Sequence, residues 1–303
     1  MVADHVTQLL SLTPWVDKVW GYPRFPKGPK PWQDFGRVRA LRNASFDVVI
    51  NLNGSDRSSL LTWLSGAPLR LGRRPQDGGP LHWSLQFTHT VDHPYHGMPV
   101  YEQRWNCLRL AGIPCGEKPE FRTEISSAAR RKAGITAEDD GHYIHISPFT
   151  TQDHKELPEE ELVALISLIQ NPPLEAQTRP HRVILSCAPS RRELDKMARL
   201  VKALAEAPWK VFPGSLDILA LSSVLAGAFS HFGGDSGALH LALMSDIPTV
   251  SWFRQYDGMK DWMPNGQLHR SVIGLESGAT GISGISGQAL FSQWDNLPKR
   301  LPA

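Results

Sequence analysis

Polar residues in the second half of the chain have types and spacing that suit an activated sugar phosphate. The turn Gly234–Gly237 follows an apolar run at Ala228–Gly233 and opens a helical pattern. The first amides of a helix lack internal partners and the helix dipole adds partial positive charge, so this position favours a phosphate. Gly237 lets a ligand approach the backbone, Ser236 offers a hydroxyl or a helix cap, and Asp235 suits sugar hydroxyls. An ordinary capped helix explains the same turn equally well.

A second loop, Pro148–Leu157, carries groups of the same kind. Thr150 and Thr151 supply hydroxyl donors and Lys155 supplies a point charge, which together suit a diphosphate. The alternative is a polar surface loop whose lysine pairs with nearby acids. Two such loops at one edge of a sheet favour phosphate binding.

Basic residues gather in the first half, where Arg57 lies in the loop after the apolar run Phe46–Leu52. Arg70, Arg73 and Arg74 follow shortly afterwards. Guanidinium groups in such number suit an acidic ligand. A solvated basic face is the alternative, and the arginines alone favour it.

Alternating strands and helices must position these loops. In the second half this alternation predicts a doubly wound parallel sheet, and such sheets bind ligands beyond the carboxyl ends of their strands. The predicted strands are His142–Ser147, Arg182–Cys187, Lys210–Phe212, Ala228–Gly233 and Thr249–Phe253, and the predicted helices start at Pro158, Ser190, Leu216, Ala238 and Gln288.

The first half predicts a second, less regular α/β domain. We expect domains over residues 1–124 and 125–303, with the last helix packing back on the first domain. The predicted strands are Val16–Trp20, Phe46–Leu52, Leu69–Gly72 and Leu85–Thr90, and the predicted helices include Asp4–Leu12, Trp32–Asn43 and Val100–Ala111.

Composition excludes several classes of protein. The 303 residues are 41% hydrophobic and 20% charged, as in a globular protein, and the formal net charge of +2 argues against a general nucleic-acid binder. Three widely spaced cysteines match neither a disulfide framework nor a zinc site and suggest a reducing compartment. The sequence has no Walker loop, dinucleotide fingerprint, nucleophile elbow, metal-ligand cluster or signal peptide.

Two segments, TTQDHK at 150–155 and GGDSGALHLALMSDIPTVSWF at 233–253, resemble the donor-site motifs of the ADP-heptose:lipopolysaccharide heptosyltransferases, glycosyltransferase family 9. The segment beginning at Phe46 and the loop Trp262–Gly266 are also similar to that family. The resemblance implies an α/β fold of the GT-B type: two Rossmann-like, doubly wound parallel-sheet domains that face a central cleft. It also implies an inverting transfer from ADP-heptose with no metal and no cofactor.

The resemblance assigns roles to individual residues. The first domain would bind the acceptor, a Kdo-bearing lipid A or core oligosaccharide, and the second would bind the nucleotide-sugar. The protein would be cytoplasmic, with peripheral contact to the inner membrane. His240 matches the family's histidine, although packing under the loop explains it equally well. The implied donor residues are Thr150, Thr151, Lys155, Asp235, Ser236, Gly237 and His240, and the implied acceptor residues are Arg57, Ser58 and Arg73.

The chain departs from the family at its start. The family opens with a strand and a glycine-containing loop whose aspartate is the expected general base, and this chain begins after that piece, so we expect the piece to be missing. Asp56 and His93 are substitute candidates for the base. A glutamate that contacts the donor in some relatives is replaced by Ala188–Arg191. Two alternatives therefore stay open: a non-catalytic relative that binds a nucleotide-sugar or glycan, and an enzyme that uses a UDP- or GDP-sugar.

Overall fold

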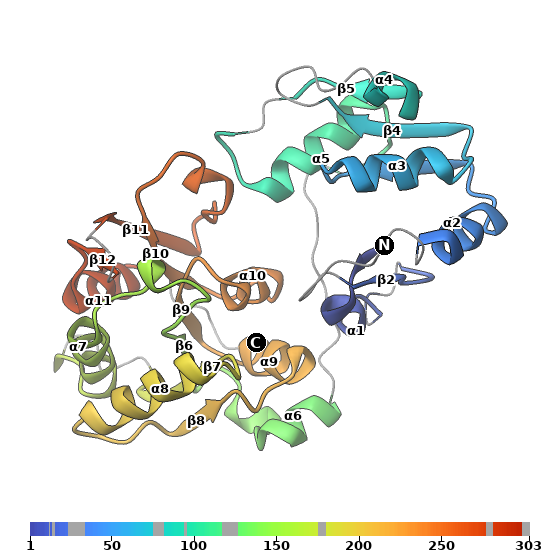
Figure 1. Ribbon diagram of the computed structural model, residues 1–303. Coiled ribbons are helices and arrows are strands. Elements are labelled where there is room, and N and C mark those ends of the chain that lie inside the picture. The colour runs from blue at the N-terminus through green and yellow to red at the C-terminus, as the bar shows by residue number, and fades with distance from the viewer. Residues whose placement is uncertain are drawn as a thin grey trace. The chain divides into compact units, whose positions relative to one another are not determined.

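In the computed structural model the chain folds into two compact units (Figure 1). The smaller unit is Gly21–Glu120, and the larger consists of Asp4–Trp20 with Phe121–Ala303. The expected boundary at 124/125 lies outside the described residues. The helix near the amino terminus groups with the larger unit and not, as expected, with the first domain. The structure describes residues 1–11, 13, 16–23, 34–74, 82–93, 96–116, 127–174, 180–276 and 281–298.

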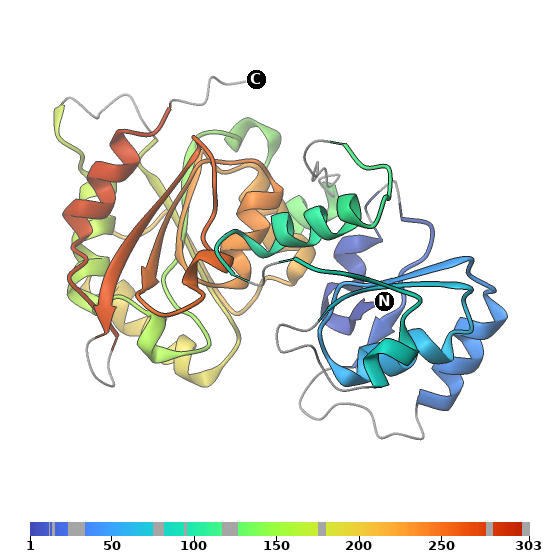
Figure 2. The ribbon, with the colours of Figure 1, turned by 90° about the horizontal axis from the view of Figure 1, so that it is seen from above.

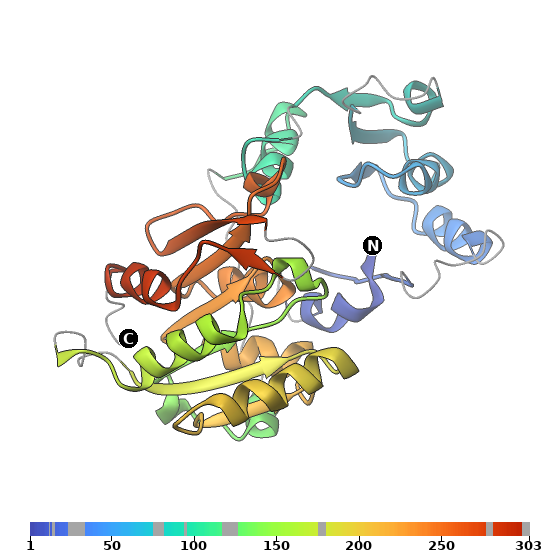
Figure 3. The same cartoon turned by 60° about the vertical axis from the view of Figure 1, so that its left-hand side comes forward.

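The larger unit is built on a seven-stranded sheet with the order β12-β11-β10-β9-β6-β7-β8 (Figure 3). The strands pair in parallel except β12, which is antiparallel to β11. The strands are β6 (Tyr143–Ser147), β7 (Arg182–Cys187), β8 (Lys210–Pro213), β9 (Ser230–Gly234), β10 (Thr249–Arg254), β11 (His269–Glu276) and β12 (Ile282–Ser283). The helices are α1 (Thr7–Leu10), α6 (Ser127–Ala133), α7 (Glu159–Gln170), α8 (Arg191–Ala203), α9 (Ile218–Ala226), α10 (Gly237–Met244) and α11 (Gly287–Asp295).

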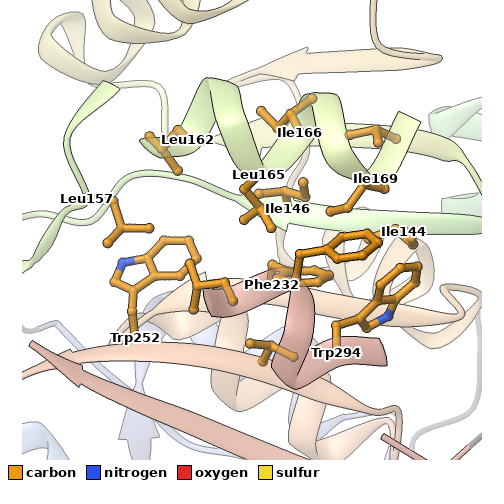
Figure 4. Close-up of a cluster of buried hydrophobic side chains, with 14 of the residues drawn as sticks. Ile144, Ile146, Leu157, Leu162, Leu165, Ile166, Ile169, Phe232, Trp252 and Trp294 are labelled. Atoms are coloured by element: carbon orange, nitrogen blue, oxygen red, sulfur yellow. The ribbon is translucent and has the colours of Figure 1, made fainter. Parts of the chain in front are cut away.

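Separate hydrophobic clusters cover the two faces of this sheet. One contains side chains of α7, α8 and α11, with Phe232, Trp252 and Trp294 fully buried among them (Figure 4). The other contains side chains of α1, α6, α9 and α10, including Leu9 and Leu241. Because both faces are covered, the central strands β6, β9 and β10 are buried along almost their whole length, as expected for a parallel sheet.

The order of the strands creates a switch point between β6 and β9. The chain proceeds from β6 to β7 and β8 in one direction, and from β9 to β10 and β11 in the other. Ser147, the last residue of β6, pairs with Gly233 of β9. The loops after these two strands therefore leave the same edge side by side, where doubly wound sheets bind their ligands.

The smaller unit contains a three-stranded parallel sheet, β3-β4-β5, with α3 and α5 on opposite faces (Figure 2). Ser55 caps α3 by accepting a hydrogen bond from the amide of Ser58. The elements are α2 (Asp34–Asn43), β3 (Val48–Asn51), α3 (Asp56–Leu64), β4 (Leu69–Arg73), α4 (His82–Gln86), β5 (His89–Val91) and α5 (Val100–Leu110), and two short strands, β1 (Val2–Ala3) and β2 (Gly21–Tyr22), pair with each other.

Some elements differ from the sequence prediction. Residues Val16–Trp20 form no strand, and Leu85–Thr90 divides between the end of α4 and β5. Strand β11 was not predicted, because its outward-facing Ile273 and Leu275 obscure the alternation typical of a half-buried strand. The last helix contacts α7, β10 and β11, and its Trp294 lies in the core of the larger unit.

Candidate functional site

The two polar loops of the larger unit meet at the switch point. The Lys155 ammonium donates a hydrogen bond to Asp235 Oδ2 over 2.6 Å. Lys155 ends the short 3-10 turn Asp153–Lys155 after β6, and Asp235 follows β9 directly. The lysine side chain is 25% exposed and that of the aspartate 11%, so the pair is partly shielded from water. The structure thus brings together a cation and a carboxylate, the groups expected for a phosphate and for sugar hydroxyls.

Gly234 allows this close approach of the loops. A Cβ atom at this position would lie 2.7 Å from Trp252 Nε1, 3.2 Å from the Lys155 carbonyl oxygen and 3.3 Å from Thr150 Cγ2. Real Cβ atoms do not come so near to an indole nitrogen, so only glycine fits between the two loops.

The start of α10 is open. Ser236 is the N-cap residue but makes no side-chain cap hydrogen bond, and its Oγ has no partner within the described part of the chain. Gly237 is exposed, and a Cβ added to it would meet nothing within 4 Å. The helix start is therefore exposed at Gly237, whereas the Ser236 hydroxyl is buried without a partner in the described part of the chain. The first amides of a helix suit an anion.

His240 lies one turn into α10. Its ring packs edge-on against Trp262, with the ring centroids 5.8 Å apart. Burial lowers the pKa of His240, and the negative charge of Asp235 acts against that shift. The histidine is therefore neutral near pH 7, and its contact with Trp262 is compatible with both interpretations of this residue.

The two threonines of the β6 loop differ. Thr150 is buried, and its hydroxyl donates to the Gln152 carbonyl over 2.9 Å and accepts from the Gln152 amide over 3.1 Å. Thr151 is exposed. In the structure Thr150 therefore shapes the loop, and Thr151 has the more accessible hydroxyl.

A buried carboxylate that the sequence did not reveal braces this loop. Glu156 is 3% exposed and accepts from the Thr150 amide over 2.8 Å. Helix α8 supplies two cations to it, Arg192 over 3.0 Å and Lys196 over 2.6 Å. Both cations also pair with Asp153, and these contacts, led by the hydrogen bond from Lys196, lower the pKa of Asp153. Glu156 directly follows the predicted lysine, but only the tertiary fold shows that α8 reaches it.

In the smaller unit Arg57 forms an ion pair. Its Nε and Nη2 lie 2.9 Å and 2.5 Å from Asp34 Oδ2, and its guanidinium lies over the ring of Tyr22. Ser58 is tied to its own loop, because its hydroxyl donates to the Ser55 carbonyl over 2.8 Å. These contacts fix the start of α3, from which Arg57 projects.

The remaining candidates are also held by neighbours. Arg73 donates to the carbonyl oxygen of His93 and to Gln103 Oε1 over 3.0 Å, which links β4 to α5. The Arg73 guanidinium thus contacts the backbone carbonyl oxygen of His93. Asp56 accepts from the indole of Trp83 over 3.3 Å. These contacts show local positioning and assign no general base.

A metal site and a membrane-spanning helix each have requirements that the described residues do not meet. The described residues hold no group of three or more histidine, cysteine, aspartate or glutamate side chains that would suit a metal ion. Of the helices within the described ranges, none has the length and apolar character needed to cross a bilayer.

Solved structures share this fold. A family 9 glycosyl transferase from Veillonella parvula superposes with a TM-score of 0.75 at 16% identity, over 96% of this chain and 85% of the other. Escherichia coli heptosyltransferase WaaC with ADP-2-deoxy-2-fluoro heptose gives 0.72 at 20% identity, over 97% and 88%. Escherichia coli ADP-heptose lps heptosyltransferase II gives 0.69 at 16% identity, over 97% and 86%.

The sequence agrees with the fold. No curated protein matches the chain. The model of glycosyltransferase family 9 (heptosyltransferase), however, matches residues 36–277. That match spans most of the sequence, so the chain belongs to glycosyltransferase family 9, the heptosyltransferase family, and is a glycosyltransferase with a GT-B-type α/β fold.

Proposed function

We propose that this enzyme transfers a heptose from ADP-heptose to an inner-core acceptor of lipopolysaccharide, with inversion and without a metal. The observation that carries the proposal is the Lys155–Asp235 pair beside the open start of α10. Similarity to structures that hold ADP and an ADP-heptose analogue supports the choice of donor.

The residues of the larger unit suit the donor. In an inverting transfer an acceptor hydroxyl oxygen attacks the anomeric carbon, a base takes its proton, and the bond from that carbon to the diphosphate breaks, so that ADP leaves with the electron pair. Lys155 and the amides at Ser236 and Gly237 stabilise the negative charge that develops on the diphosphate. Asp235, once separated from Lys155, accepts hydrogen bonds from the sugar, and Thr151 donates to a phosphate oxygen.

We assign the acceptor to the smaller unit. Arg57 and Arg73 supply charge that suits the carboxylates and phosphates of a Kdo-bearing lipid A or core oligosaccharide, and Ser58 lies beside Arg57. Asp56 and His93 are the candidate bases. Because the acceptor is a lipid, the enzyme works in the cytoplasm at the surface of the inner membrane.

Release of ADP tests the proposal. The purified protein is incubated with ADP-heptose and a deep-core acceptor, alone and as the Lys155→Ala and Asp235→Ala variants. We expect each variant to lose about tenfold or more of the rate, because each removes a charged hydrogen-bonding group. Lys132→Ala is the matched control, since Lys132 forms an exposed pair with Asp217 over 2.5 Å. Unchanged rates in both site variants would contradict the assigned site.

The same purified protein distinguishes the proposed function from its two alternatives. Competition among ADP, UDP and GDP identifies the base of the nucleotide. Binding of an ADP-sugar by calorimetry without any product would instead indicate a non-catalytic relative.

A further inference from the structure

Arg254 ends β10 directly beside the turn that carries Asp235. Trp252 pairs with Gly234 across the parallel strands. Arg254 is the last residue of β10, two residues beyond Trp252, and Asp235 directly follows the last residue of β9. The end of β10 therefore lies at the same edge of the sheet as the two loops described above.

Tyr256 connects Arg254 to that site. Its ring centroid lies 5.8 Å from Arg254 Cζ and 5.9 Å from Lys155 Nζ, and both distances fall within the range of cation–π attraction. Because Lys155 Nζ lies 2.6 Å from Asp235 Oδ2, the Tyr256 ring is also close to that carboxylate. Burial, followed by the charge of Asp235, raises the pKa of Tyr256 to about 12, so the phenol keeps its proton near pH 7. Asp235 is thus paired with Lys155, and the Tyr256 side chain lies beside this pair with a hydroxyl that can donate.

These contacts suggest how the site separates the two parts of a donor. A diphosphate draws Lys155 away from Asp235, because phosphate oxygens carry more charge than the carboxylate. Tyr256 then remains to hold the carboxylate toward the sugar. An arginine at the same edge offers the diphosphate a planar fork of donors, which a lysine alone cannot provide.

We propose that Arg254 and Tyr256 form a third wall of the nucleotide-sugar site, in which Arg254 binds the diphosphate and Tyr256 orients Asp235 toward the sugar hydroxyls. The inference rests on the proposed function, since it assumes a nucleotide-sugar at this edge. It adds the last residue of β10 and a residue of the following loop, to which neither the donor motifs nor the Lys155–Asp235 pair assigns a role.

Calorimetry with ADP and with ADP-heptose tests both roles. We expect Arg254→Gln to weaken both ligands by about tenfold or more, since it removes charge-assisted hydrogen bonds, and to reduce the dependence of ADP affinity on salt. Tyr256→Phe keeps the ring, so ADP affinity should stay unchanged, whereas ADP-heptose should bind about three- to tenfold more weakly. Arg182→Gln is the matched control: Arg182 also lies over an aromatic ring, Trp209, at 5.0 Å, but at the amino end of β7.

Each result either supports or contradicts the proposed roles of Arg254 and Tyr256. If wild type and Arg254→Gln bind ADP equally, or if Tyr256→Phe weakens ADP and ADP-heptose alike, the inference is wrong while the proposed function stands. If the wild type binds no nucleotide, both are wrong. Should thermal unfolding show that Arg254→Gln does not fold, Arg254→Lys replaces it. Lysine keeps the charge but lacks the fork, so an affinity for ADP below that of wild type supports the proposal and an equal affinity contradicts it.

Discussion

The Lys155 ammonium and the Asp235 carboxylate lie 2.6 Å apart, although 80 residues separate them along the chain. Each ion neutralises the other in a partly shielded environment. A sugar diphosphate has to divide this pair, because its phosphates compete for the lysine and its hydroxyls compete for the aspartate. In the absence of a donor, Asp235 therefore occupies the lysine that would bind the diphosphate, and Lys155 occupies the carboxylate that would bind the sugar.

This competition leads to an unusual expectation for Asp235→Asn. The amide no longer attracts Lys155, so ADP should bind about three- to tenfold more tightly than to the wild type. Preference for ADP-heptose over ADP should fall, because a neutral amide accepts more weakly from sugar hydroxyls. Calorimetry with both ligands measures the two effects, with the exposed Asp195→Asn on α8 as control. Weaker ADP binding by Asp235→Asn would show that the aspartate does not restrain the lysine.

The sequence predicted this edge of the sheet well, because the signals there are local. Gly237, Pro158 and the alternation of strands mark helix starts and strand ends whatever the rest of the chain does. The partners of these residues could not be predicted in the same way. Nothing near Glu156 indicates that Arg192 and Lys196 reach it from α8, and nothing near Tyr256 indicates that its ring lies beside Lys155. The arginines of the first half appeared as a basic face, but Arg57 and Arg73 each have specific partners.

Glu156 should be important for stability as well as for the site. Glu156→Gln keeps the shape but removes the charge that balances Arg192 and Lys196, and breaking a buried ion pair typically costs about 3–5 kcal/mol. Because Asp153 still balances part of that charge, we expect a loss of about 2–4 kcal/mol in the free energy of unfolding. Urea denaturation measures it. The matched control is Glu159→Gln on α7, since Glu159 is 43% exposed and lies 3.5 Å from Arg199. Equal stability of the two variants would mean that Glu156 does not brace the loop.

Two buried histidines give the larger unit a dependence on acid. His145 Nδ1 lies 2.9 Å from His231 Nδ1, and His145 Nε2 lies 2.8 Å from Ser186 Oγ, across β7, β6 and β9. Burial lowers the pKa of His231 to about 3 and that of His145 well below its ordinary value. The folded protein therefore binds fewer protons than the unfolded chain below about pH 6.5, the ordinary pKa of histidine.

The lowered pKa values of His145 and His231 determine how the stability of the protein changes with pH. The stability from the neutral pair is complete above about pH 6.5 and is lost as pH falls, by at most about 1.4 kcal/mol per pH unit for each histidine. Urea unfolding from pH 7.5 to 4.5 should show this slope. His240 and His269, whose pKa values are also lowered, add to it. In His145→Gln/His231→Gln the slope should be shallower, whereas the exposed His142→Gln should leave it unchanged. Identical slopes in all three proteins would show that the buried pair does not titrate on unfolding.

Substitutions of Gly234 and Gly237 test the packing of the site and its ligand binding separately. Gly234→Ala places a methyl group against the Trp252 indole and the Lys155 backbone, so we expect a loss of about 1–3 kcal/mol in unfolding free energy from overpacking. Gly237→Ala meets nothing within 4 Å, and alanine favours a helix, so stability should be equal or slightly higher. Its methyl group nevertheless lies at the open helix start, where a phosphate would approach, so ADP affinity should fall. Urea denaturation and ADP calorimetry on both variants measure this contrast. A Gly237→Ala variant that binds ADP as the wild type does would mean that the diphosphate does not approach the start of α10.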